Sequence, residues 1–180
     1  MKRLFLLLAI ILMASCGFSQ DVKNEESKKV DAFASKTGVI IKFIDYSLPS
    51  INTPFGTAET KIRKFITGGV VGYFYQISYK EKYDTETASI AYDDLIEIIK
   101  AIQQLNEEAA KDVLDQKNYI ENKFITSDGF QVGYYVGNGM ANWYIQFEKY
   151  GSENTILINN FSIIETAFNN AKSKIEELKQ

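Results

Sequence analysis

The chain has 180 residues, enough for one domain with a buried core, and it contains no histidine, one cysteine and a formal net charge of -3. The missing histidine and second cysteine exclude Ser-His-Asp and Cys-His catalytic triads, disulfide bonds and zinc sites built on those residues. The acidic balance argues against nucleic acid as a partner. We expect no metal and no cofactor.

The first twenty residues have the organisation of a bacterial secretory signal. Met1-Lys2-Arg3 is a short basic start, residues 4–14 are all apolar, and small residues follow. The apolar run is shorter than the roughly 20 residues that a membrane-spanning helix needs, so it does not predict a permanent membrane span.

Two cleavage sites compete at the end of this signal. Met13-Ala14-Ser15-Cys16 resembles the motif in which a small pair precedes a lipid-modified cysteine, although methionine departs from the usual first residue. The rival cut follows Ser19, because Gly17 and Ser19 are the small residues of an ordinary secretory signal. We favour acylation of Cys16, the only cysteine. The predicted location is the periplasm or outer membrane of a bacterium.

A polar tether and one folded domain follow the signal. Residues 20–36 are charged and have little to bury, which is typical of a flexible linker. Residues 37–180 are expected to form a single domain that begins with a β-branched strand at 38–46. Both prolines, Pro49 and Pro54, fall within residues 48–60, which predicts the longest loop of the domain.

Three strands and a helix complete the first half. The strands are predicted at 61–67, 70–80 and 86–92. Asp93 or Asp94 is expected to cap the helix, whose apolar residues then recur at helical spacing. That stripe consists of Leu95, Ile98, Ile99, Ile102, Leu105 and Ala109.

The second half has the same order of elements. Asn138-Gly139 indicates a two-residue hairpin turn, because both residues tolerate positive φ. A helix at 160–178 has a capping signal in Ser162 and Glu165. The strands are predicted at 119–126, 130–136, 142–150 and 154–159. We expect one core shared by both helices, which includes Leu95, Ile99, Ile102, Ile164, Phe168 and Ile175.

Short strings shared between the halves suggest an internal duplication. The strings are KFIT at 64–67 and 123–126, and VGYF at 71–74 with VGYY at 132–135. The repeats would cover residues 60–110 and 118–178, each a β-sheet followed by a helix. Chance similarity between aromatic strands is the alternative. Either way the predicted class is α+β, an antiparallel β-sheet with two helices on one face.

Catalysis without histidine would depend on carboxylates. A pair held about 5 to 9.5 Å apart can act as acid and base, as in glycosidases. The candidate pairs are Asp93 with Asp94, Asp84 with Glu86, and Glu107 with Glu108. A helix cap, a hairpin turn and a solvated helix face explain these pairs without catalysis, so we do not expect an enzyme.

Aromatic residues on the outer face of the sheet form a candidate interaction surface. Strand alternation turns Val71, Tyr73, Tyr75, Ile77, Val132, Tyr134, Val136, Trp143, Ile145 and Phe147 inward. It turns Phe74, Tyr135 and Tyr144 outward, among glycines and amides. Rigid rings and amides suit recognition, although ordinary cross-strand pairing also explains them.

The sequence therefore favours an exported, lipid-anchored envelope protein that binds a protein or glycan ligand without catalysing a reaction. Its other predicted partner is the membrane, through the lipid on Cys16. Nucleic acid is not expected, because removal of Lys2 and Arg3 leaves 18 basic and 23 acidic side chains. The alternatives are a carboxylate-dependent hydrolase of envelope polysaccharide and an inhibitor or assembly factor of another envelope protein.

Overall fold

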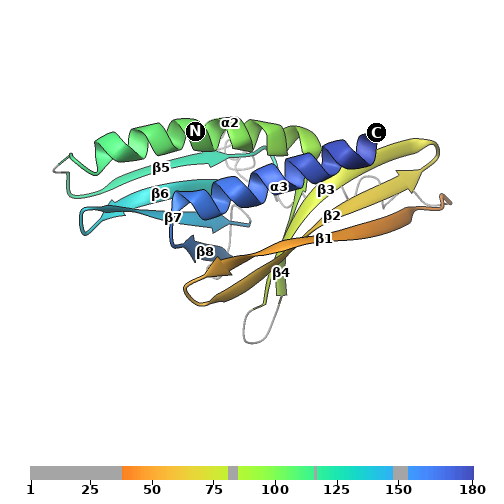
Figure 1. The fold of residues 1–180 in the computed structure, drawn as a ribbon, viewed down its shortest axis with the longest axis horizontal. Coiled ribbons are helices and arrows are strands. Elements are labelled where there is room, and N and C mark those ends of the chain that lie inside the picture. The colour runs from red at the N-terminus through yellow and green to blue at the C-terminus, as the bar shows by residue number, and fades with distance from the viewer. Residues whose placement is uncertain (1–37, 81–84, 116, 148–153) are drawn as a thin grey trace, which may run out of the picture.

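Two antiparallel four-stranded sheets and two helices make up the protein in a computed structural model, which describes residues 38–80, 85–115, 117–147 and 154–180 (Figure 1). The predicted α+β class is confirmed, with two sheets where one was expected. The signal, Cys16 and the tether lie outside the described residues. None of the described helices is long and apolar enough to cross a membrane.

Each sheet is a simple meander followed by one helix. Sheet A consists of β1 (Lys42–Thr53), β2 (Gly56–Thr67), β3 (Val70–Lys80) and β4 (Thr85–Ala91), in that order. Sheet B consists of β5 (Ile120–Ile125), β6 (Gln131–Gly137), β7 (Met140–Gln146) and β8 (Thr155–Ile158), also in order. Helix α2 (Tyr92–Asp112) follows sheet A, and helix α3 (Phe161–Lys179) follows sheet B. This confirms a tandem β-sheet-plus-helix unit.

The shared strings do not align these units. KFIT lies in the second strand of sheet A but in the first strand of sheet B, and VGYF and VGYY lie in the third and second strands. Each string therefore lies one strand later in sheet A than its match does in sheet B. The first unit also begins at Lys42 rather than at residue 60. The strings therefore do not mark equivalent strands of the two units, and a duplication stays a prediction.

The predicted loop at 48–60 is mostly strand. β1 continues through Pro49 to Thr53, and its register against β2 shifts between Leu48 and Ile51. The Thr60 hydroxyl donates to the Pro49 carbonyl at 2.9 Å, which holds this irregularity in place. Proline is tolerated because β1 is an edge strand, where a missing N–H leaves no ladder bond unmade.

Two hairpins turn through matching pairs of residues with positive φ. Asn138 and Gly139 have φ of 54° and 72°, which confirms the predicted turn between β6 and β7. Gly68 and Gly69, between β2 and β3, have φ of 53° and 81°. Such turns match the twist of the strands they join.

Both helices begin differently from the prediction. Ala91 is the N-cap of α2 and makes no side-chain cap, so Asp93 and Asp94 lie inside the first turn, where negative charge is favourable. In α3 the cap is Asn160, whose side chain accepts from the Ile163 N–H at 3.3 Å. Ser162 supports that cap by donating to Asn160 at 2.6 Å.

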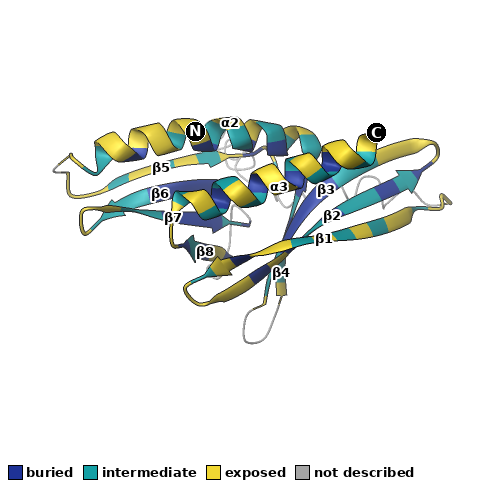
Figure 2. Ribbon diagram, in the orientation of Figure 1, coloured by how far each residue is buried: buried dark blue, intermediate teal, exposed yellow. Residues whose placement is uncertain are grey.

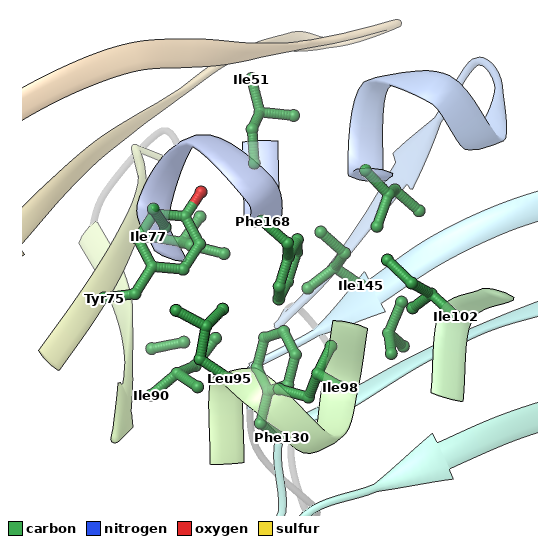
Figure 3. Packing of buried hydrophobic residues seen from close by; sticks show 14 of the residues in the cluster. Ile51, Tyr75, Ile77, Ile90, Leu95, Ile98, Ile102, Phe130, Ile145 and Phe168 are labelled. Carbon is green, nitrogen blue, oxygen red and sulfur yellow. The ribbon is translucent and has the colours of Figure 1, made fainter. Parts of the chain in front are cut away.

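The helices join the two units into one core. α2 contacts β3 and β4 of sheet A and also β5 and β6 of sheet B, while α3 contacts β1 and β2 as well as β8. The buried apolar side chains form one cluster that draws on both sheets (Figure 3). Phe168 of α3 lies at its centre, 5.5 Å from the Tyr75 ring and 6.1 Å from the Phe130 ring between ring centroids.

The predicted core is confirmed at every position except one. Leu95, Ile102, Ile164, Phe168 and Ile175 are fully buried. Ile99 is only partly buried, although it packs against the core, and Ile98 of the predicted stripe is fully buried. The buried residues of α2 all belong to the predicted stripe, and the helix contacts both sheets (Figure 2).

Candidate functional site

Two of the three rings predicted to face solvent are buried. Phe74 is 3% exposed and Tyr144 is 5% exposed, whereas Tyr135 is half-buried. The expected exposure of Phe74 and Tyr144 is therefore wrong. Val71, predicted to face the core, is 47% exposed because it lies at the open end of sheet A. The other residues predicted to face inward are buried or pack against the core.

Phe74 is buried by a ring on the neighbouring strand. Phe65 stacks on it with 5.4 Å between ring centroids. The Phe65 ring also lies over Gly72, where a Cβ would overlap it. The space left by a missing side chain is thus filled by a ring, and the outer face of sheet A offers no projecting Phe74 for recognition.

Tyr144 reaches across sheet B to a carboxylate. In the strand register it stands opposite Gly133, and its hydroxyl donates to Oε1 of Glu121 on β5 at 2.5 Å. Tyr119 donates to the other oxygen at 3.2 Å, and Nζ of Lys123 lies 3.4 Å from Oε1. We call these four residues, Tyr119, Glu121, Lys123 and Tyr144, the Glu121 cluster.

The Glu121 cluster is built for stability rather than proton transfer. The hydrogen bond from Tyr144 lowers the pKa of Glu121, and the Lys123 charge adds to this effect. Burial raises the pKa of Tyr144 well above its usual range, and the bond to Glu121 raises it further. At neutral pH the carboxylate is ionised and the phenol protonated, so neither group is poised to exchange a proton.

A second polar network fastens α2 to sheet B. Tyr134 donates to Oδ2 of Asp112 at 2.8 Å, and the Asn122 amide donates to the same oxygen at 2.7 Å. These two donors offset the unfavourable position of Asp112 at the negative end of the helix dipole. Burial raises the pKa of Tyr134 to about 12, so this phenol is also no acid or base near neutrality.

An open hollow of about 250 Å³ lies between β1 and α3. Its apolar part comes from buried Ile51 with Ile163 and Ala167 beside it, and the irregular segment of β1 forms one wall. The polar side chains around it are Ser50, Asn52, Ser162, Thr166 and Asn170. All five are uncharged, and no ionisable residue lines the hollow.

The candidate catalytic carboxylates lie away from this hollow. Asp93 and Asp94 are in the first turn of α2, and Glu107 and Glu108 are exposed near its other end, where Glu108 pairs with Lys111 at 2.6 Å. Glu86 lies in β4, and its predicted partner Asp84 is outside the described residues. Among the described residues no group of three or more His, Cys, Asp or Glu is placed to hold a metal ion.

Sequence reasoning missed both the hollow and the Glu121 cluster. Pro49 inside an otherwise strand-like run was the available signal for the hollow, since proline in a strand marks an edge or a bulge. Tyr119, Glu121 and Lys123 alternate along β5 and its start, but nothing in the sequence indicated that Tyr144 of β7 joins them. No protein-family model, curated protein or solved structure matches the chain.

Proposed function

We propose that this is an exported bacterial envelope protein, anchored by a lipid on Cys16, that binds an uncharged glycan segment in the hollow between β1 and α3. The observation that carries the proposal is the lining of the hollow. Five hydroxyl and amide side chains surround an isoleucine floor, and none of the lining residues is charged. Such groups can bond sugar hydroxyls, while the apolar floor contacts the ring carbons.

The size and position of the hollow favour part of a longer ligand. Its volume of about 250 Å³ is slightly below the usual range of small-molecule pockets, and its polar side chains are exposed at the surface. One segment of a chain-like ligand can therefore enter the hollow from its open side. The buried Thr60 bond to Pro49 holds one wall rigid, which lowers the entropic cost of binding.

The same lining favours binding over hydrolysis. Cleavage of a glycosidic bond needs two carboxyl groups on opposite sides of the bond. The hollow has serines and a threonine but no acid, base or histidine beside them to activate a nucleophile. The hydrolase alternative would need a site elsewhere, and no observation on the described residues favours one.

Glycan binding is tested with a matched pair of variants. Neutral oligosaccharides prepared from bacterial envelopes are screened on an array, and hits are titrated by calorimetry. Asn52→Ala/Thr166→Ala/Asn170→Ala should weaken binding at least tenfold, because each lost hydrogen bond is worth roughly 0.5–1.5 kcal/mol. The control Gln104→Ala/Asn106→Ala removes exposed polar groups of α2 and should bind normally. Equal binding by both variants would reject the site.

The anchoring part of the proposal has its own test. Mass spectrometry of the mature amino terminus should find an acylated Cys16 as the first residue. A mature chain that starts at Gln20 would remove the lipid anchor from the proposal and leave export in place.

A further inference from the structure

The free end of sheet A carries a group of exposed apolar side chains. Ile40 is 92% exposed, and the other members are between 43% and 48% exposed. We call this group, Val39, Ile40, Phe43, Val70 and Val71, the apolar end. β1 begins here, and the strand register places Lys42, Ile66 and Val71 in one row, so β1, β2 and β3 meet at this end (Figures 1 and 2).

The strand segments that form the apolar end carry basic and no acidic side chains. Residues 38–44 and 64–73 contain no Asp or Glu, although the whole chain is acidic. Nζ of Lys64 lies 5.6 Å from the centre of the Tyr73 ring, and Nζ of Lys179 lies 6.0 Å from the same ring. Apolar residues bordered by lysine and tyrosine are typical of surfaces that rest at a membrane interface, where lysine stems lie along the lipid and their charges reach water.

The amino-terminal segment joins the fold at this same end. Gly38 is the first described residue and lies just before Val39 and Ile40. About twenty residues separate it from Cys16, a span of at most roughly 75 Å when fully extended. A lipid on Cys16 would therefore be joined to the fold through this end of sheet A.

We propose that the apolar end docks on the surface of the membrane that holds the lipid, an inference that rests on the proposed acylation of Cys16. The side chains enter the interfacial layer, and Lys42 and Lys64 face the lipid phosphates. The hollow lies further along β1, at Pro49 to Asn52, which is roughly 25–35 Å from the apolar end at the rise of a β-strand. This orientation keeps the glycan site clear of the bilayer.

The test compares two hairpin tips in the acylated protein. Val70 and Met140 are each the first residue after a two-residue turn, and they are 48% and 60% exposed at opposite ends of the molecule. Val70→Cys and Met140→Cys are purified from detergent-solubilised membranes, labelled with an environment-sensitive fluorophore and reconstituted in phosphatidylcholine vesicles with and without phosphatidylglycerol. Because an acylated Cys16 has no free thiol, only the new cysteine takes up the label.

The proposal predicts a blue-shifted label at Val70 that is quenched by nitroxide lipids, and a water-exposed label at Met140. Ile40→Ser should at least halve the quenching at Val70 and leave Met140 unchanged. Equal, weak quenching at both sites would overturn the proposal. A blue shift at Val70 in detergent without vesicles that grows with protein concentration would assign the apolar end to a second copy and also overturn it. Labelling of the unsubstituted protein would show instead that Cys16 is not acylated.

Discussion

The two halves of this protein have the same order of elements but bury their outer faces by different means. On sheet A a ring from β2 fills the space over a glycine and stacks on Phe74. On sheet B the Tyr144 side chain, opposite a glycine, ends in a hydrogen bond to Glu121. One architecture is thus stabilised by ring stacking in one half and by a polar cluster in the other.

Sheet A also carries a group of partly exposed ion pairs around Asp45. On sheet A, Arg63 forms two 2.8 Å hydrogen bonds to Asp45, and Lys61 adds a third. The Arg63 guanidinium holds the pKa of Asp45 well below its usual range. These side chains are about a third exposed, and such ion pairs contribute little to stability. What the halves share is the core between them, through Phe168 and the two helices.

The largest expected effect concerns this shared core. Phe168→Ala should lower the free energy of unfolding by about 3–5 kcal/mol, because it removes a ring that contacts Tyr75 of sheet A and Phe130 beside sheet B. Denaturant unfolding followed by Trp143 fluorescence and by far-ultraviolet circular dichroism should remain one transition. Separate transitions would show that the halves are independent. Lys172→Ala and Glu97→Ala are controls on less buried helix positions and should cost less than about 1 kcal/mol.

The next largest effect is expected from alanine substitutions of the glycines on the two outer faces, Gly133 of sheet B and Gly72 of sheet A. A Cβ at Gly133 would overlap the backbone of β5 at Asn122 and Lys123, whereas the atoms nearest to a Cβ at Gly72 all belong to the Phe65 ring. Backbone in a paired strand moves less readily than a side chain. Gly133→Ala should therefore cost about 3 kcal/mol or more, and Gly72→Ala about 1–3 kcal/mol. Chemical denaturation of both variants checks the order, and a reversed order would contradict this account of the close strand approach.

Alkaline pH should act on sheet B through Tyr134. Burial raises the pKa of Tyr134 to about 12, against about 10 in the unfolded chain. The folded state therefore keeps a proton that the unfolded state loses, and stability should fall by about 1–3 kcal/mol as pH rises from 10 to 12. Tyr134→Phe should reduce this fall without removing it, because burial also raises the pKa of Tyr144 on the same sheet. Tyr46→Phe is the control at a half-buried tyrosine of sheet A, and an equal change in both variants would contradict the assignment.

The smallest expected effect comes from comparing the Arg63–Asp45 ion pair of sheet A with the Tyr144–Glu121 hydrogen bond of sheet B. Arg63→Ala removes a partly exposed ion pair and should cost at most about 1 kcal/mol, with the loss shrinking as salt screens the charges. Tyr144→Phe removes a bond to a carboxylate at a buried phenol and should cost about 1.5–3 kcal/mol at low and high salt alike. Urea midpoints at two ionic strengths measure both. A strong salt dependence at Tyr144 would place this phenol in water.

Sequence periodicity by itself determined the elements of the fold. The strand at 70–80 and the turn at Asn138-Gly139 agree with the structure, and five of the six predicted core positions are buried. These features depend on neighbours along the chain, on side chains that alternate or recur every three to four residues and on residues that tolerate positive φ. Local chemistry suffices for them.

Tertiary structure alone decided which strands share a sheet, what covers each face and where a site lies. Phe74 and Tyr144 alternate outward as expected, but a ring from β2 and a carboxylate on β5 meet them through cross-strand packing that alternation does not describe. The hollow lies between residues of β1 and residues of α3 that are more than a hundred positions apart in the sequence. Such contacts follow from the packing of both halves into one core, which no local pattern specifies.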